Sequence, residues 1–222
     1  MYIAPPQSVG SLSACDRLTI LYFPQERFET DWRGVMMNIS VECLVSSLSC
    51  EGCPADHLVD PDRIREIETL RVSEYAKMAQ PPRAILLCES APRCRFVYDL
   101  RSSYVNKGLR YSLRQELVPE ATDAELLAEL RRLRVWIVDC ALCPLHQLCT
   151  NRDKRRAATE CLKRHTRPYL DQNATAVLYK LFPSRRGFLK TEVPDIAGRM
   201  SGMFPFSSQI GLREELRRAG VA

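Results

Sequence analysis

Cysteines spaced as metal ligands are the residues of this sequence best suited to chemistry. The chain has ten cysteines in 222 residues. Six of them lie in two groups: Cys50 and Cys53 form a CxxC pair, and the later group is Cys140, Cys143, Cys149 and Cys161. The pair and two cysteines of the later group can supply four thiolates to one site, which suits zinc or an iron–sulfur cluster. The sequence therefore predicts a metal centre and leaves the choice of metal open.

Two acidic residues, Glu89 and Asp139, are the next candidates because each follows a short apolar run. Residues 84–87 read AILL and residues 135–138 read VWIV, as expected for buried strands of a parallel sheet. Ligands of open α/β sheets bind at the carboxyl ends of the strands. We therefore expect Glu89 and Asp139 on one rim of the sheet, with an ordinary strand-to-loop acid as the alternative for Glu89.

Helices are predicted before both strands. One begins at Pro61 with Asp60 as its cap, and another opens at the capping box Thr122-Asp-Ala-Glu125. This repeated order of helix and apolar strand indicates βαβ connections. We therefore expect an α/β fold, a three-layer sandwich with a central, mostly parallel four-stranded sheet.

The remaining segments complete this arrangement. Further strands are predicted at residues 18–23 and 174–179, a helix is predicted from Asp31, and a last helix is capped by Ser207 and Ser208. No structure is assigned to residues 101–118. We treat 1–222 as a single domain in which residues 1–60 form an N-terminal arm that brings the CxxC pair to the metal site.

The net charge of +5 is unevenly distributed. Residues 131–167 contain ten Lys or Arg and three acidic residues. Such a cluster is typical of a nucleic-acid-binding surface, and a solvated helix face is the alternative. No run of 18 apolar residues occurs, and the N-terminus lacks the basic and apolar regions of a signal peptide. We therefore expect a cytoplasmic protein without a membrane span.

Together, these motifs resemble the uracil-DNA glycosylase superfamily, in particular its iron–sulfur branch. Members have a CxxC pair and then a strand that runs into Gly-Glu-Ala-Pro-Gly, for which the counterpart here is Cys88-Glu89-Ser90-Ala91-Pro92-Arg93. A second strand ends in Asn-Val-Val-Lys-Cys in the family, and here Val138-Asp139-Cys140-Ala141-Leu142-Cys143-Pro144 fits it. The resemblance covers about residues 43–217. It implies a DNA glycosylase of the DNA-repair type, a hydrolase that acts on a flipped base in DNA.

The resemblance also implies roles for individual residues. Glu89 would be the carboxylate that positions water or stabilises the sugar. The family's donor to the departing base is a His that this chain lacks, and Ser207, Ser208 or a backbone amide would take its part. The residues implied to contact the base are Asp139, Ser90, Phe96 and Tyr98; for the two aromatic rings, a place in the core is the alternative. The ligands implied for a 4Fe-4S cluster, with zinc as the alternative, are Cys50, Cys53, Cys143 and Cys161. A monomer is expected to hold DNA phosphates through Arg152, Lys154, Arg155 and Arg156.

Three departures from the family pattern bear on the reaction. Cys88 and Arg93 replace the two glycines of the first motif, and Asp139 replaces the Asn that reads the base. The family's His-Pro-Ser has its nearest match at residues 204–208, FPFSS, which contain no His. An ionised carboxylate only accepts hydrogen bonds, so Asp139 predicts altered or lost uracil specificity. The retained Glu89 favours an enzyme, whereas the missing His favours a noncatalytic nucleic-acid-binding protein with the same fold and metal centre.

Two further alternatives concern single motifs. The spacing Cys140-x2-Cys143-x5-Cys149 also resembles the C-terminal cluster motif of CRISPR-associated RecB-type nucleases. The strand pair with Asp and Glu-x-Lys that those nucleases need is not found in the sequence. His165, four residues after Cys161, is interpreted as a solvated helical residue, with a metal ligand or a DNA contact as the alternatives.

Overall fold

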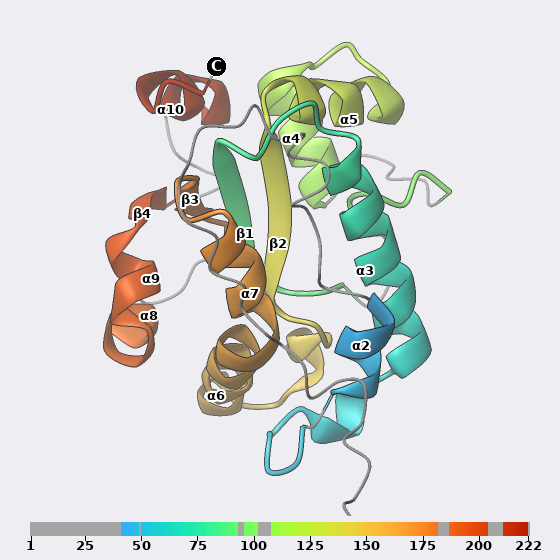
Figure 1. The fold of residues 1–222 in the computed structure, drawn as a ribbon, viewed down its shortest axis with the longest axis vertical. Coiled ribbons are helices and arrows are strands. Elements are labelled where there is room, and N and C mark those ends of the chain that lie inside the picture. The colour runs from blue at the N-terminus through green and yellow to red at the C-terminus, as the bar shows by residue number, and fades with distance from the viewer. Residues whose placement is uncertain are drawn as a thin grey trace, which may run out of the picture.

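A parallel four-stranded sheet forms the centre of the computed structural model, which describes residues 41–48, 50–92, 96–101, 108–181, 187–203 and 211–221 (Figure 1). The strands are β1 (Ala84–Ser90), β2 (Val135–Ala141), β3 (Val177–Lys180) and β4 (Met200–Met203), in the spatial order β2-β1-β3-β4. All three neighbouring pairs are parallel. The predicted α/β class with a parallel sheet is therefore confirmed.

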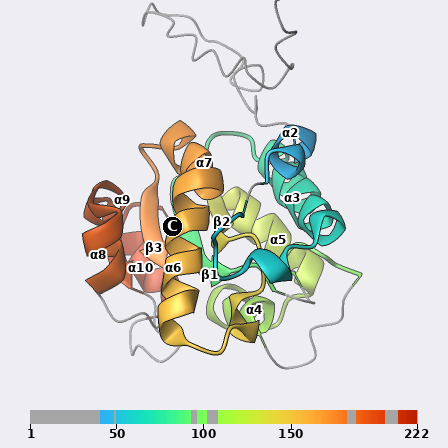
Figure 2. The same ribbon diagram turned by 90° about the horizontal axis from the view of Figure 1, so that it is seen from below.

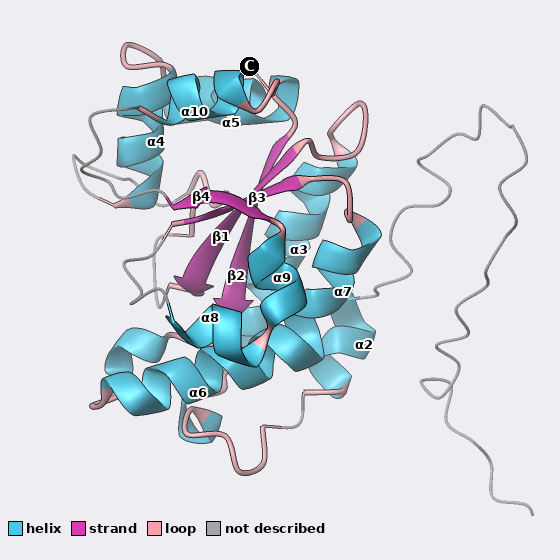
Figure 3. Ribbon diagram, turned by 90° about the vertical axis from the view of Figure 1, so that its left-hand side faces the viewer, coloured by secondary structure: helices cyan, strands magenta, loops and turns pink. Residues whose placement is uncertain are grey.

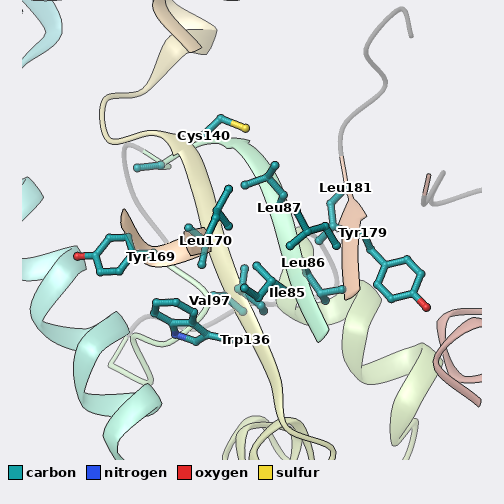
Figure 4. Packing of buried hydrophobic residues seen from close by; sticks show 14 of the residues in the cluster. Ile85, Leu86, Leu87, Val97, Trp136, Cys140, Tyr169, Leu170, Tyr179 and Leu181 are labelled. Carbon is teal, nitrogen blue, oxygen red and sulfur yellow. The ribbon is translucent and has the colours of Figure 1, made fainter. Parts of the chain in front are cut away.

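The two central strands form because their residues are apolar on both faces. All seven residues of β2 are buried, as are the first four of β1. This is the composition that a sheet covered by helices on both sides requires. The cluster around these strands includes Leu86, Trp136 and Leu170, which Figure 4 shows among the side chains packed around β1 and β2. The predicted strands at 84–87, 135–138 and 174–179 correspond to β1, β2 and β3.

Helices lie on both faces of the sheet, with α3 and α7 on one side and α4 on the other (Figure 3). The helices within the described residues are α2 (Val41–Ser46), α3 (Pro61–Ala76), α4 (Leu109–Leu117), α5 (Asp123–Arg132), α6 (Asn151–Cys161), α7 (Arg167–Gln172), α8 (Gly187–Glu192), α9 (Pro194–Gly198) and α10 (Leu212–Arg218). Two 3-10 turns, η1 (Asp56–Leu58) and η2 (Leu145–Gln147), and a π-helical turn, Leu162–Thr166, lie between them. No helix in the described segments is long and apolar enough to cross a membrane.

The predicted caps of α3 and α5 are confirmed. The Asp60 carboxylate accepts a hydrogen bond of 3.0 Å from the Arg63 N–H. At α5, the Thr122 hydroxyl accepts from the Glu125 N–H, and the Glu125 carboxylate accepts from the Thr122 N–H at 2.7 Å. Both arrangements satisfy N–H groups that an uncapped helix leaves without a partner.

Several elements differ from the prediction, and other predicted elements lie outside the described residues. Helix α4 forms where no structure was assigned, and β4 is a strand that the sequence pattern did not indicate. The predicted strand at 18–23, the start of the helix from Asp31, and the cap at Ser207 and Ser208 lie outside the described residues. Within the described part, the last helix begins at Leu212, after Gly211.

Candidate functional site

The CxxC pair lies in a tight turn between α2 and α3. Gly52 has a φ of 75°, a left-handed conformation that glycine adopts without strain. The Cys53 N–H donates to the Cys50 carbonyl at 2.7 Å, and the Ala55 N–H donates to the Cys53 sulfur at 3.5 Å. The turn thus holds two half-buried sulfurs near each other and supplies one N–H···S contact.

The other two predicted ligands come from the segments that follow β2. Cys143 lies two residues after β2 ends, and Cys161 is the last residue of α6; both are buried. The Leu142 N–H donates to the Cys161 sulfur at 3.2 Å, which joins the end of α6 to the residue before Cys143. N–H groups directed at sulfur are a recurring feature of thiolate sites, where they tune the bound cluster.

These four thiols are near enough to affect one another electrostatically. Burial raises the pKa of Cys161, and the thiols of Cys143, Cys50 and Cys53 raise it further. Burial, with Cys53 and Cys50, raises the pKa of Cys143 to about 12. Burial and then Cys53 raise the pKa of Cys50. Three segments far apart in the sequence therefore meet at one group of four cysteines, which we call the cysteine group.

A further hydrogen bond links the CxxC turn to α6. The Arg156 guanidinium donates to the Gly52 carbonyl at 3.1 Å, across 104 positions of the chain. Figure 2, which views the molecule from the carboxyl ends of the strands, shows α6 along this edge. Of the two extra cysteines, Cys140 is buried and Cys149 is exposed.

The donor set fits a thiolate-bound metal centre, although the side chains are not drawn together around one ion. Among the described residues, no three His, Cys, Asp or Glu side chains already stand in an arrangement that could hold a metal ion. Four cysteine sulfurs with N–H···S contacts are the ligands that zinc and iron–sulfur clusters use. The Cys50, Cys53, Cys143 and Cys161 side chains would hold such a centre, and the metal would tie the CxxC turn to β2 and α6.

Asp139 lies inside the fold rather than at an open site. Its carboxylate accepts a hydrogen bond from the guanidinium of Arg71, which also donates to the Glu68 carboxylate. The side chains of Arg71 and Glu68 are 0% exposed, and that of Asp139 is 4% exposed. The Tyr169 hydroxyl donates to Glu68 at 2.9 Å. We call Glu68, Arg71 and Asp139 the buried ion cluster; in it, Asp139 is engaged by α3 and buried from solvent.

Glu89 and Asp139 reach the same edge of the sheet but point to opposite faces. Cys88 lies opposite Asp139 in the β1–β2 register, and Ser90 lies opposite Ala141. Because side chains alternate along a strand, Glu89 points to the face opposite that of Asp139. Glu89 and Ser90 are half-buried. Burial raises the pKa of Cys140 on the neighbouring strand, and nearby groups that include Glu89 raise it further. The structure therefore brings Glu89 near Cys140 and not into a pair with Asp139.

The two candidate stacking residues, Phe96 and Tyr98, are both in the core. They are 2% and 4% exposed, and their rings pack edge to face at 5.4 Å. The Tyr98 hydroxyl accepts a hydrogen bond of 2.8 Å from the Ile137 N–H on the edge strand β2. Phe96 lies below the Arg71 guanidinium, 5.2 Å from ring centroid to cation. Neither ring presents a face to solvent. Both therefore have the place in the core that was the alternative to base stacking.

His165 is also buried, so the interpretation as a solvated residue is wrong. It lies in the π-helical turn Leu162–Thr166 and is 7% exposed. The Thr166 hydroxyl donates to the Asp139 carbonyl at 2.8 Å, which holds this turn against β2. A π-helical turn has an extra residue, so the helical spacing that predicted an outward position does not apply. Burial, with Arg164, lowers the pKa of His165, whose Nε2 has no hydrogen-bond partner in the described part of the chain.

A pocket of about 350 Å³ opens beside the cysteine group at the carboxyl edge of the sheet. It lies between the start of α3, the turn that follows β1 and the segment that follows β2. Its lining residues are His57, Leu58, Val59, Asp60, Arg63, Ile64, Ile67, Pro92, Leu142, Cys143, Pro144 and Gln147. Cys143 belongs both to the pocket wall and to the cysteine group. The segments that carry the predicted motifs therefore meet around this pocket.

The four cations predicted to hold phosphates lie on the first two turns of α6. Arg152 and Arg156 are exposed, and Lys154 and Arg155 are half-buried. Arg152, Lys154 and Arg155 form no ion pair with any residue that the structure describes, whereas Arg156 is bound to the CxxC turn. Three cations of α6 are thus available to a polyanion. Ser207, the last of the predicted site residues, lies outside the described residues.

Sequence reasoning did not identify Arg71, Glu68 or Arg63 as site residues. Each lies on α3 next to an apolar residue, where helical periodicity assigns a charged residue to the solvent side. The sequence carries no signal for Arg71 and Glu68, because Asp139 is expected at an open rim and only a buried carboxylate requires a partner.

Comparisons with protein families, with curated proteins and with solved structures found no match to this chain.

Proposed function

We propose that this protein binds nucleic acid through α6 and that a metal centre on Cys50, Cys53, Cys143 and Cys161 holds the binding surface in place. The observation that carries the proposal is that hydrogen bonds join both the CxxC turn and the segment of Cys143 to α6, the helix that ends at Cys161 and carries the unpaired cations. A metal bound there would link α6, the CxxC turn and β2 into one rigid unit. Such a unit fixes the spacing of cations that must match successive phosphates.

We propose a 4Fe-4S cluster for the cysteine group, with zinc as the alternative. Four thiolates are suitable ligands for both, and the resemblance to the iron–sulfur branch of the uracil-DNA glycosylases favours the cluster.

The metal part of the proposal is tested on protein purified anaerobically. We expect a brown protein that contains iron and acid-labile sulfide in equal amounts and little zinc. Cys161→Ser and Cys143→Ser should each lose most of the iron, whereas Cys149→Ser should keep it because Cys149 is exposed and outside the cysteine group. A colourless protein with one zinc per chain would select the alternative. Full metal content in the Cys161→Ser and Cys143→Ser variants would contradict the ligand assignment.

The nucleic-acid part is tested by fluorescence anisotropy with a single-stranded oligonucleotide over a range of salt concentrations. Arg152→Gln/Arg155→Gln should weaken binding and reduce the slope of log K against log salt by about 1.4, since each lost phosphate contact on a single strand contributes about 0.7. The matched control is Arg217→Gln/Arg218→Gln on α10, which removes the same charge from a helix where both residues are ion-paired. Equal effects of the two double variants would mean that net charge, rather than α6, determines binding.

A second candidate, a glycosylase acting on a flipped base in DNA, is favoured by the pocket at the carboxyl edge of the sheet. The resemblance to the iron–sulfur uracil-DNA glycosylases and the parallel sheet support a glycosylase-like three-layer fold. Glu89 near this edge remains the candidate carboxylate. The burial of Asp139 argues against its role as base reader, because Arg71 binds its carboxylate inside the fold.

Oligonucleotides that each carry one damaged or deaminated base separate the two candidates. An enzyme would convert one of them to an abasic product, and Glu89→Gln would abolish that conversion without weakening binding. Binding to all of them with no abasic product from any would reject the glycosylase and leave the binding protein.

A further inference from the structure

Two arginines lie side by side at the amino edge of the sheet, the edge opposite the cysteine group. Arg83 directly precedes β1, and Arg134 directly precedes β2. The first residues of these strands, Ala84 and Val135, are partners in the parallel register, and the Arg83 N–H donates to the Arg134 carbonyl at 2.8 Å. Figure 1 shows α5 and α10, which border this edge, at the top and α6 at the bottom. The arginine pair, Arg83 and Arg134, is therefore remote from the surface proposed to bind nucleic acid.

Both side chains of the arginine pair are held by neutral acceptors. The Arg134 Nε donates to the Pro81 carbonyl at 2.7 Å, and its Nη1 donates to the side-chain oxygen of Gln80 at 2.6 Å. The Arg83 Nη1 donates to the Gly220 carbonyl at 3.2 Å. These hydrogen bonds orient the two guanidinium groups without neutralising them. Within the described residues, neither arginine has an acidic partner.

The two guanidinium groups repel each other and have donors that are not used. Burial lowers the pKa of Arg134, and the neighbouring charge of Arg83 lowers it further. In the described part of the chain, the Nε and Nη2 of Arg83 and the Nη2 of Arg134 have no hydrogen-bond partner. The Nε–Nη2 edge of an arginine is a fork that binds two oxygens of one anion. An anion between the two groups would remove the repulsion and accept from these donors.

The backbone at Arg134 is strained. Its φ is 56°, and it is the one non-glycine residue with a positive φ among those described. It follows Leu133, the C-cap of α5, at a position where glycine is favoured because a β carbon is unfavourable in this conformation. Strained residues of this kind are concentrated at binding and active sites. The strain is therefore a second reason, besides charge, to assign a binding role to Arg134.

Stabilisation of helix ends, the ordinary role of arginine at this edge, is supplied by other residues. Arg132 in the last turn of α5 pairs with Glu129, and Arg217 in the last turn of α10 pairs with Glu214. The arginine pair lies outside both helices and has no such acid among the described residues. Its charge thus remains available to an anion from solution.

A phosphate monoester is the anion that suits this pair best. Its charge at neutral pH is about −1.5 to −2, which matches two guanidinium groups without acidic partners. Its three terminal oxygens can accept from both groups at once, whereas the two oxygens of a carboxylate are occupied by one arginine fork. A phosphodiester of nucleic acid carries a single charge and leaves one guanidinium unneutralised.

We propose that Arg83 and Arg134 form a binding site for free phosphate or for the phosphate group of a small monoester, at the amino edge of the sheet. This site is separate from the metal centre and from the nucleic-acid surface along α6. No motif of the sequence assigns a ligand to either arginine.

Calorimetry on the full-length protein at constant ionic strength tests the proposal. Inorganic phosphate and ribose 5-phosphate should show saturable binding, and dimethyl phosphate, a diester, should bind more weakly. Binding of inorganic phosphate without ribose 5-phosphate would identify the free ion as the ligand. Arg83→Gln should raise the Kd about tenfold or more, as expected from the loss of a charged hydrogen bond. The matched control is Arg132→Gln, which removes the same charge from the same edge but from an arginine paired with Glu129, and it should leave the Kd almost unchanged.

Arg134→Gly separates binding from folding. Glycine adopts a φ of 56° without strain, so the variant should keep the circular dichroism spectrum of the wild type and lose phosphate binding as strongly as Arg83→Gln. On the wild type, phosphate should slow hydrogen exchange in residues 80–84 and 132–136. This readout needs no variant and locates the site directly.

Several results would overturn the proposal. Absence of phosphate binding by the wild type is one, and equal losses in Arg83→Gln and Arg132→Gln are another, because they would assign binding to net charge. Full binding in Arg134→Gly, or protection confined to other segments, would also reject the site. If Arg83→Gln weakened oligonucleotide binding as much as Arg152→Gln/Arg155→Gln does, the edge would belong to the nucleic-acid surface instead.

Discussion

Replacing Arg71 with methionine would show how much the buried ion cluster contributes to the attachment of α3 to β2. Methionine keeps the apolar stem of the side chain but removes the guanidinium. The carboxylates of Glu68 and Asp139 would then be buried without the cation that now binds both. The hydrogen bond from the Trp136 indole to the Arg71 carbonyl, 3.3 Å long, involves the backbone and is retained. The variant thus isolates the charge.

The expected loss is large because none of the three side chains is screened by water. Removing one partner of a buried ion pair costs about 3–5 kcal/mol, and side-chain exposures of 0–4% leave no reason to reduce this figure. The lost cation–π contact with Phe96 adds about 1 kcal/mol. Set against a free energy of unfolding of about 5–15 kcal/mol, this change should lower Tm by roughly 10–20 °C, at about 2–4 °C per kcal/mol.

Asp139→Asn is the matched variant, and its effect should be small and dependent on pH. It leaves Glu68 paired with Arg71 and removes a negative charge that burial disfavours. Burial raises the pKa of Asp139 by more than Arg71 lowers it. An acid whose pKa is raised by folding stabilises the fold when protonated; this contribution is complete below the unfolded pKa of about 3.9 and is lost as pH rises through the folded pKa. The wild type should therefore gain stability relative to Asp139→Asn as the pH falls from 7 towards 4.

Urea unfolding followed by tryptophan fluorescence measures both effects, because Trp136 packs against Tyr75 and Tyr169 in the same region. Curves are recorded for the wild type, Arg71→Met and Asp139→Asn at several pH values. Equal losses in the two variants would refute the reasoning, because they would show that the fold needs an ionised Asp139 as much as it needs Arg71. If the stability of the wild type relative to Asp139→Asn does not increase as the pH falls, the assigned direction of the pKa shift of Asp139 is wrong.

Three further predictions follow from single contacts. Tyr98→Phe should lower the free energy of unfolding by about 1–3 kcal/mol, because the buried Ile137 N–H loses its acceptor. Urea unfolding measures this change, and a loss smaller than about 0.3 kcal/mol would contradict the prediction. Thr122→Ala should cost about 1 kcal/mol through the loss of the capping box, seen as a lower Tm in calorimetry. Arg156→Gln should release the Gly52 carbonyl and speed hydrogen exchange in residues 50–55 without changing exchange in β1. Unchanged exchange in residues 50–55, or an equal change in both segments, would contradict the role given to this hydrogen bond.

The strands and capped helices could be predicted because their signals are local. The apolar runs at 84–87 and 135–138 can only be buried, and the Thr122 capping box sets the start of α5 within one residue. Helix α4 was missed because its N-cap is Gly108, which has a φ of 90° and no side-chain oxygen to form a cap. Strand β4 was missed because MSGM has neither an apolar run nor a regular alternation.

The candidate site was only partly predictable because its contacts join distant parts of the chain. The CxxC spacing and the later cysteines predicted a metal centre, since metal ligands must have defined chemistry and spacing, and the resemblance implied which four cysteines would bind it. The buried ion cluster joins Arg71 to a residue 68 positions away, and no periodicity along α3 distinguishes a charged residue that faces solvent from one that meets a buried acid. The inward position of His165 depends on a π-helical turn, which has no simple sequence signal.

The burial of Asp139 changes what the likeness to the glycosylase motifs means for this chain. In the family, the residue at this motif position reads a base, which requires an open side chain with a donor and an acceptor. Here the position holds an acid that Arg71 binds inside the fold, so its polar groups are already used for stability. This use of Asp139 inside the fold favours the proposed nucleic-acid-binding protein over the glycosylase, because the position is no longer open to a base.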